Sequence, residues 1–203
     1  MMKALGAAKS MTLAGAASTA STASSAAEKP VSKNHRYLIE RTFPPNALDG
    51  VDAAAKQSVN ANNSTVQVTW EKSYANADKT KTYCIYRGPN EAAVREAAKL
   101  NGLPVDNVTE IPLDYKPEPA GAVHEIASGK QRYLVTRRGD VAFHDVNDGK
   151  FGVRLITAYL TPDKRSSHAI YEASDFGSVE RAAKAGGASF ESITAIPETL
   201  YPR

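Results

Sequence analysis

The pattern of hydrophobic and polar positions changes its period several times along residues 36–112. Apolar positions four residues apart indicate helices, whereas apolar positions that alternate with polar ones indicate strands. The segment therefore predicts, in order, strand 36–43, helix 48–62, strand 66–71, strand 82–86, helix 91–100 and strand 105–111. Asn62-Asn63 is expected to end the first helix, and Asn90 is expected to cap the start of the second.

The second half of the chain repeats most of this pattern. Residues 153–197 align with residues 68–112 without a gap, at a constant offset of 85 residues. A chain that carries two copies of one unit is best interpreted as a duplication. The identical pairs include Tyr74/Tyr159, Asp78/Asp163, Lys79/Lys164, Ile85/Ile170, Tyr86/Tyr171, Ile111/Ile196 and Pro112/Pro197.

The start of the second copy is shorter than that of the first. Residues 132–134 match residues 36–38 at an offset of 96, so eleven residues are missing between the first two strands of the copy. Its first helix is expected to shrink to about Asp140–Asp148. The remaining elements are predicted as strand 152–160, strand 167–171, helix 176–185 and strand 192–196.

The order β-α-β-β-α-β defines a ferredoxin-like unit of the α+β class. The predicted organisation is a tail at residues 1–34, unit 1 at 35–112, a Pro- and Gly-containing linker at 113–130 and unit 2 at 131–203. In unit 1 the second strand alternates, which places Glu71 and Ser73 opposite Trp70. The copy has Ile156 and Ala158 at those two positions, so its strand is apolar on both faces and both must be covered.

Helices cover one face of such a sheet, and the sister sheet is the simplest cover for the other. The sequence therefore predicts two tandem ferredoxin-like (βαββαβ) units packed face to face as an intramolecular dimeric α/β barrel. On this arrangement the chain is either a monomer that forms a pseudo-dimer by itself or a homodimer.

Composition narrows the function classes. The chain is 42% hydrophobic and 23% charged, with a net charge of +3, which is typical of a globular protein. Basic residues are scattered rather than clustered, so nucleic acid is not an expected partner. The longest apolar runs are too short for a membrane span. The single cysteine, Cys84, excludes an internal disulfide and a CxxC motif, and is expected to be a buried strand residue.

The first 34 residues differ from the rest of the chain. Lysines are the only charged residues before Glu28, and an Ala/Ser/Thr tract ends in Ser25-Ala26-Ala27, where a signal peptidase would cut. The segment is either a signal peptide, which makes the protein exported (periplasmic or secreted), or a disordered tail of a cytoplasmic protein.

Several motifs of unit 1 resemble a family of small bacterial nickel-binding proteins with a ferredoxin-like fold, a domain of unknown function. The motifs are YLIERTFP (37–44), VTWxxSY (68–74), DKTKTYCxY (78–86) and REAA (95–98) leading to GLP (102–104). The resemblance implies Ni²⁺ as a ligand. It also implies histidine between the Trp and the Ser-Tyr pair, where this chain has Lys72 and its copy has Thr157. Lysine is a poor metal ligand at neutral pH, so the nickel site is expected to be weakened or lost.

The histidines offer few alternatives. His35 and His124 are expected at the surface. His144 and Asp145 fall in the shortened region, where a loop would present both to a metal, and His168 is the third metal candidate. His168 lies on a strand at the position equivalent to Tyr83, either packed and hydrogen-bonded or acting as a general base.

The remaining catalytic candidates are Glu40 and Tyr83. Glu40-Arg41 is either an ion pair across the open sheet face or a polar anchor for a ligand. Two functions therefore stay open: a binding or structural protein for a divalent metal or small molecule, and a cofactor-free monooxygenase or isomerase with its pocket near His168.

Overall fold

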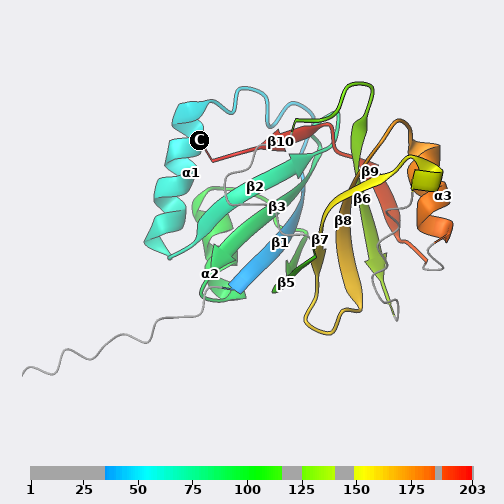
Figure 1. Ribbon diagram of the computed structural model, residues 1–203. Coiled ribbons are helices and arrows are strands. Elements are labelled where there is room, and N and C mark those ends of the chain that lie inside the picture. The colour runs from blue at the N-terminus through cyan, green and yellow to red at the C-terminus, as the bar shows by residue number, and fades with distance from the viewer. Residues whose placement is uncertain (1–34, 116–124, 140–148, 186–188, 203) are drawn as a thin grey trace, which may run out of the picture. The chain divides into compact units, whose positions relative to one another are not determined.

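The computed structural model describes residues 35–115, 125–139, 149–185 and 189–202 (Figure 1). The expected signal segment, the segment with His144 and Asp145, and the shortened helix predicted near Asp140–Asp148 lie outside these ranges. In the described part of the chain the longest helix has 13 residues, and no helix is long and apolar enough to cross a bilayer.

The first repeat has the predicted β-α-β-β-α-β order. Its elements are β1 (His35–Thr42), α1 (Ala53–Thr65), β2 (Thr69–Ala75), β3 (Lys81–Gly88), α2 (Glu91–Leu100) and β4 (Asn107–Glu110). Helix α2 has the predicted bounds because neighbouring residues set both of its ends. The side chain of Asn90 accepts a hydrogen bond from the backbone N–H of Ala93 at 2.8 Å, and Gly102, beyond the last turn, has a positive φ of 63°.

Helix α1 begins later and ends later than expected. Asp52 caps its start by accepting the backbone N–H of Ala55 at 2.8 Å, so the preceding residues form turns. Asn63 does not end the helix. It is buried inside α1, and its Oδ1 accepts a hydrogen bond from Asn101 at the end of α2, at 2.9 Å. This tertiary partner lets a residue that favours helix ends lie within the last turn.

The second repeat follows the same plan with one described helix. Its elements are β6 (Gln131–Arg138), a 3₁₀ turn (Gly149–Phe151), β7 (Arg154–Leu160), β8 (Ser166–Ala173), α3 (Phe176–Ala185) and β9 (Ser192–Ala195). Strands β6 and β8 pair in the same antiparallel manner as β1 and β3. The two repeats therefore have the same strand framework in their described parts.

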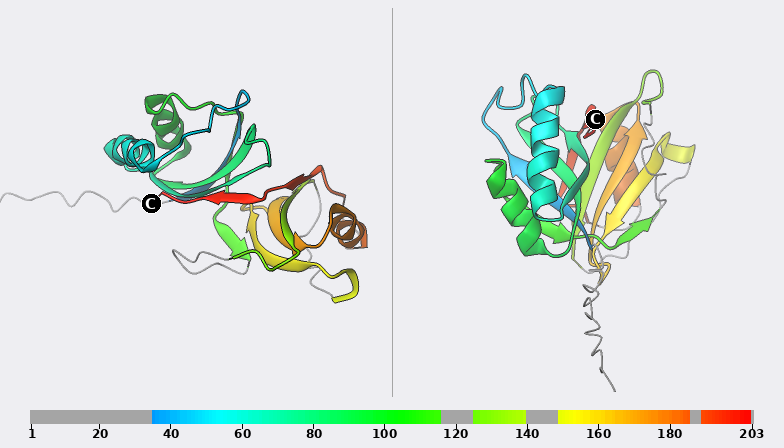
Figure 2. Two further views of the ribbon diagram at one scale, coloured as in Figure 1. Left: turned by 90° about the horizontal axis from the view of Figure 1, so that it is seen from above. Right: turned by 90° about the vertical axis from the view of Figure 1, so that its left-hand side faces the viewer.

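Two three-residue strands that the sequence did not predict are exchanged between the repeats. Strand β5 (Leu113–Tyr115) leaves the first repeat and pairs with β7, and β10 (Glu198–Leu200) leaves the second and pairs with β2. The sheet orders are β10-β2-β3-β1-β4 and β5-β7-β8-β6-β9. Figure 2 shows β10, in red, reaching from the second repeat to the first. Strand β5 lies within the segment predicted to be a linker.

Each exchange begins at a repeated Ile-Pro pair. Ile111 and Ile196 are fully buried at the ends of β4 and β9, and Pro112 and Pro197 follow them. Proline cannot continue a sheet ladder, so the chain leaves its own sheet at this point. The repeated Ile-Pro pairs are thus the two crossing points between sheets.

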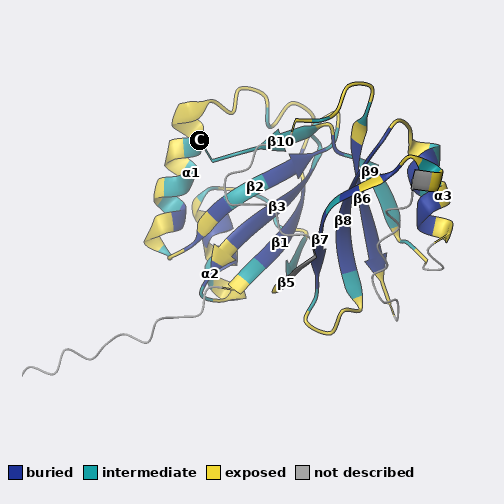
Figure 3. Cartoon of the chain, in the orientation of Figure 1, coloured by how far each residue is buried: buried dark blue, intermediate teal, exposed yellow. Residues whose placement is uncertain are grey.

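The two sheets share a hydrophobic core, which confirms the predicted face-to-face packing. The shared core draws on both repeats and consists of Leu38, Tyr74, Tyr83, Ile85, Ile111, Leu134, Tyr159, Ile170 and Ile196. The hydroxyls of Tyr74 and Tyr159, which occupy the same position in the two repeats, lie 2.9 Å apart. Figure 3 shows the buried strands in dark blue and the exposed residues of the helices in yellow.

The assignment of faces on β2 and β7 was wrong in one respect. Each strand has a β-bulge, at Glu71 and at Ile156, that shifts its register by one residue. Beyond the bulge the faces are reversed, so Ser73 lies on the same face as Trp70 and bonds to it. Ala158 likewise joins the core on the helix-covered face of the second sheet.

Candidate functional site

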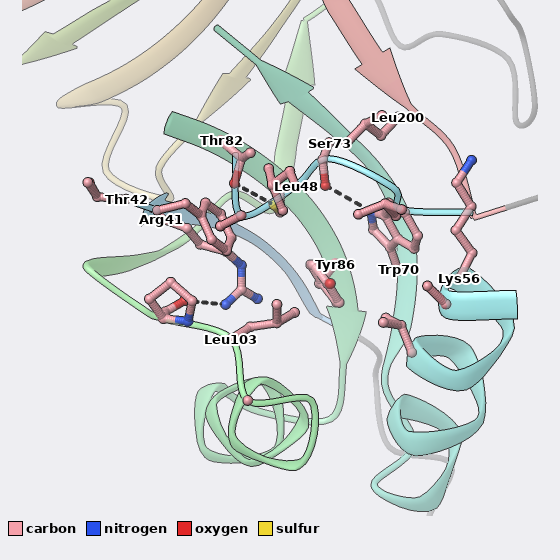
Figure 4. Close-up of a pocket in the computed structure, with 18 of the residues that line it drawn as sticks. Arg41, Thr42, Leu48, Lys56, Trp70, Ser73, Thr82, Tyr86, Leu103 and Leu200 are labelled. Atoms are coloured by element: carbon pink, nitrogen blue, oxygen red, sulfur yellow. Dashed lines mark hydrogen bonds between the residues drawn. The ribbon is translucent and has the colours of Figure 1, made fainter. Parts of the chain in front are cut away.

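A cavity of about 720 Å³ lies in the first repeat, on the face of the sheet that the helices cover (Figure 4). Strands β1, β2 and β3 form its floor, and α1 with the turns before it forms one wall. The residues after α2 and Leu200 of the exchanged strand β10 complete it. The lining residues are Arg41, Thr42, Phe43, Pro44, Ala47, Leu48, Val51, Ala55, Lys56, Val59, Trp70, Ser73, Thr82, Cys84, Tyr86, Gly102, Leu103, Pro104 and Leu200.

The sequence of α1 explains why this space is not filled. The helix begins with three alanines, and Asn63 near its end is its one buried residue. A helix that packs tightly on a sheet presents a stripe of large apolar side chains, which α1 lacks. Small side chains at its first turns leave room above the sheet.

The polar groups of the cavity floor already pair with one another. The indole Nε1 of Trp70 donates to Ser73 Oγ at 2.9 Å, across the bulge. The hydroxyl of Thr82 lies 3.3 Å from the sulfur of Cys84. Cys84 is buried and free, as predicted. Burial raises the pKa of Tyr86, and nearby Arg41 and Asn63 offset this only in part, so its phenol is neutral.

Arg41 is the exception among these satisfied groups. Its side chain is 1% exposed, and Nη1 donates to the carbonyl oxygen of Pro104. The guanidinium carbon lies 5.7 Å from the ring centre of Tyr86, and Figure 4 shows the group between Tyr86 and Leu103. The buried Nε has no hydrogen-bond partner, and no carboxylate of the described residues pairs with this guanidinium. A buried charge without a counter-ion is costly.

The predicted ion pair between Glu40 and Arg41 is wrong. Successive residues of a strand point to opposite faces, so Arg41 lies on the cavity side and Glu40 on the side of the second sheet. Glu40 Oε1 instead accepts hydrogen bonds from Arg138 of β6 at 2.8 Å and from Asn107 at 3.2 Å. The other interpretation was a polar anchor for a ligand. Of the two residues, only Arg41 lines the cavity and could have that role.

Tyr83 and His168 also lie between the two sheets and not in the cavity. The hydroxyl of Tyr83 is 3.2 Å from Thr194 Oγ1 in the other repeat, and His168 Nδ1 is 3.4 Å from Thr136 Oγ1. Burial lowers the pKa of His168 to about 4; the Glu40 carboxylate opposes this shift and the Arg138 charge adds to it. The structure thus brings Glu40 and His168 into one electrostatic cluster. The imidazole is neutral at neutral pH and only 1% exposed.

The described residues do not fit a nickel ion. His144 and Asp145 lie outside the described residues, and within the described ranges no three His, Cys, Asp or Glu side chains come together. Lys72, at the position where the family has histidine, lies on β2 with its ammonium nitrogen 6.0 Å from the ring centre of Tyr74. Within the described ranges, His168 therefore belongs to no group of three such side chains.

Sequence reasoning missed Arg41 as a cavity residue, although the pattern held a signal. Along β1, Tyr37 and Ile39 are core residues of the helix-covered face, and Arg41 is the next residue on that face. A charge at a predicted core position indicates a buried, specifically placed group. Arg137, at the same position of the second repeat, is also buried.

The fold defines a class of protein: a tandem pair of ferredoxin-like units that exchange edge strands. Within that class, residues 37–111 match the family described as nickel responsive protein SCO4226-like. The match spans the first repeat and confirms the resemblance carried by its motifs. A comparison with curated proteins finds no significant match.

Among solved structures, SCO4226 from Streptomyces coelicolor A3(2) is similar at 22% identity and a TM-score of 0.35, covering 38% of this chain and 96% of that one. Chlorite dismutase from Candidatus Nitrospira defluvii, in complex with imidazole, is similar at 11% identity and a TM-score of 0.43, covering 84% and 92%. A microcompartment protein from Desulfitobacterium hafniense DCB is similar at 16% identity and a TM-score of 0.30, covering 81% and 94%.

Proposed function

We propose that this protein binds small apolar molecules in the cavity of its first repeat. The observation that carries the proposal is the cavity itself. Its volume of about 720 Å³ falls in the range of roughly 300–1,000 Å³ that holds small-molecule ligands. The walls are mainly apolar side chains, and the paired floor groups Trp70, Ser73, Thr82 and Cys84 need no partner from the ligand.

Binding fits the lining better than catalysis does. Among the described residues that line the cavity, none carries a carboxylate or an imidazole, the groups that most often transfer protons in enzymes. The phenol of Tyr86 is held neutral by its burial. Glu40 of the first sheet and His168 of the second carry such groups, but both are packed between the two sheets and away from the cavity.

A titration of the full chain with octanamide, a neutral apolar probe, tests the proposal. Trp70 is the single tryptophan of the chain and lines the cavity, so its fluorescence reports on occupancy. We expect a saturable change. Val59→Phe fills part of the cavity and is expected to weaken binding about tenfold, which corresponds to the loss of roughly two buried methylene groups.

The matched control is Ala54→Phe, because Ala54 lies on the same helix but does not line the cavity. It should bind octanamide like the unmodified chain. The proposal fails if neither octanamide nor its carboxylate analogue octanoate causes a saturable change, or if both variants bind the probe equally well.

We also propose that nickel binding is weakened or lost relative to the family. Support comes from Lys72 at the family's histidine position and from the lack of a ligand cluster in the described residues. A metal that binds only the folded state raises the melting temperature by mass action. We expect millimolar Ni²⁺ to leave the melting temperature unchanged, and a rise of several degrees would contradict this.

Export is the third part of the proposal, and it is supported by the lysines and the Ala/Ser/Thr tract before Glu28. An exported protein is expected to be found outside the cytoplasm with a new N-terminus at Glu28. Mass spectrometry of the native protein measures this directly, and an intact N-terminus in the cytoplasmic fraction would exclude it.

A further inference from the structure

We propose that the ligand of this cavity is an apolar monocarboxylate whose carboxylate pairs with Arg41. The inference rests on the proposed function and specifies the chemistry of the ligand. It follows from the state of Arg41, from the charges around the cavity and from the apolar character of its other walls.

Arg41 is positioned before any ligand arrives. Its backbone belongs to β1, which pairs on both sides with β3 and β4, and Nη1 is fixed by the carbonyl oxygen of Pro104. The face of Tyr86 supports the guanidinium at 5.7 Å. These contacts orient the group but leave Nε without an acceptor. A carboxylate is the ligand group that best fits the N–H groups along one edge of a guanidinium.

The charges around the cavity favour an anion and disfavour a cation. In the part of the chain that the structure describes, the lining holds two cations, Arg41 and Lys56, and no Asp or Glu. Arg41 is the buried one of the two, so the electrostatic field inside the cavity comes mainly from a single positive charge in surroundings of low polarity. One negative charge on the ligand would balance it, which selects a monoanion.

The body of the ligand is specified by the remaining walls. Phe43, Leu48, Val59, Trp70 and Leu200 surround the space beside Arg41 and offer no further charge. A linear or branched hydrocarbon body would bury its surface there while its carboxylate reached the guanidinium. Medium-chain fatty acids have this chemistry.

The test compares octanoate with octanamide on the unmodified full chain at neutral pH, using the fluorescence of Trp70. The two probes have similar shapes and differ in charge. Because a hydrogen bond to a charged group contributes more than one to a neutral group, octanoate is expected to bind at least about tenfold more tightly. Equal affinities, or a preference for octanamide, would overturn the inference while leaving the proposed binding function intact.

Two variants test whether the preference for octanoate over octanamide depends on Arg41. Arg41→Met removes the charge and is expected to bring the ratio of the two affinities close to one. Arg87→Met removes an exposed arginine of the same sheet that does not line the cavity, and it should keep the ratio unchanged. A preference that survives in Arg41→Met overturns the inference. If that variant does not fold, the probe comparison on the unmodified chain decides, and failure of both probes to bind would remove the proposed function as well.

Discussion

The two repeats share their strands but differ in what covers the outer face of each sheet. In the first repeat, α1 stands above Trp70, Ser73 and Tyr86 and leaves a cavity. In the second repeat, the described residues of the same face form a packed core, in which Leu155 and Ala158 occupy the positions of Trp70 and Ser73. Phe151 and Phe190 pack against this core. The duplication thus kept a scaffold, and the proposed ligand site belongs to the first copy.

The comparison also extends to the interface between the sheets. Tyr83 and Glu40 of the first repeat correspond to His168 and Thr136 of the second. The pseudo-symmetric Tyr74 and Tyr159 still meet hydroxyl to hydroxyl. The shared core likewise holds Ile85 with its equivalent Ile170, whereas the ionisable groups buried beside it differ between the repeats.

The largest expected effect concerns the part that the repeats share. Ile111→Ala and Ile196→Ala each remove a fully buried side chain at a crossing point. We expect each substitution to lower the free energy of unfolding by about 2–5 kcal/mol, the usual result of emptying a core site. Chemical denaturation measures both values. Losses that differ by several kcal/mol would show that the two crossings are not equivalent.

The next effect concerns the asymmetric histidine. Below about pH 6.5 the unfolded chain binds a proton on His168, whereas the folded chain does so only near pH 4. Its contribution to stability is therefore present above pH 6.5 and is lost as the pH falls toward 4. Between these two pH values the contribution of His168 to the free energy of unfolding should fall by about 3 kcal/mol.

We expect His168→Gln to show a shallower fall in the free energy of unfolding over this range, measured by denaturation at several pH values. His35→Gln is the control, because it replaces an exposed histidine and leaves the buried His168 imidazole in place. A His168→Gln protein with an unchanged pH profile would contradict the assignment of a neutral buried imidazole.

The smallest effect comes from exchanging one residue between the repeats. Ser73→Ala leaves the buried indole N–H of Trp70 without its acceptor, and Ala158→Ser places a hydroxyl in an apolar core. Each substitution is expected to lower the free energy of unfolding by about 1–3 kcal/mol, which a lower melting temperature would show. If either swap is neutral, the two outer faces are more alike than their packing indicates.

The sequence predicted those features that depend on local signals or on repetition. Helices α2 and α3 were placed correctly because each has a regular apolar stripe, and α2 also has a capping Asn90. The unit order and the pairing of the sheets followed from the duplication. The packing of the two sheets was inferred from Ile156 and its neighbours, although the bulges reversed part of the face assignment.

The missed features depend on contacts between distant residues. Strands β5 and β10 have three residues each, too few to show a period, and they exist because the other sheet offers an edge. The small side chains of α1 are visible in the sequence, but the cavity that they leave depends on how this helix packs over the sheet. The sequence offers Glu40 and His168 as separate candidates, but the burial of both beside the partly exposed Arg138 is set by how the sheets pack.

The exchange of β5 and β10 has a consequence for how the chain behaves as two pieces. Each repeat supplies an edge strand that the other needs, so neither half contains a complete sheet of its own. The covalent connection keeps the two halves at a high effective concentration. Separated and expressed together, they would act as complementing fragments, and reassembly would restore the position of Leu200 at the cavity wall. If the proposed ligand site exists, binding by the first repeat would then report on the presence of the second.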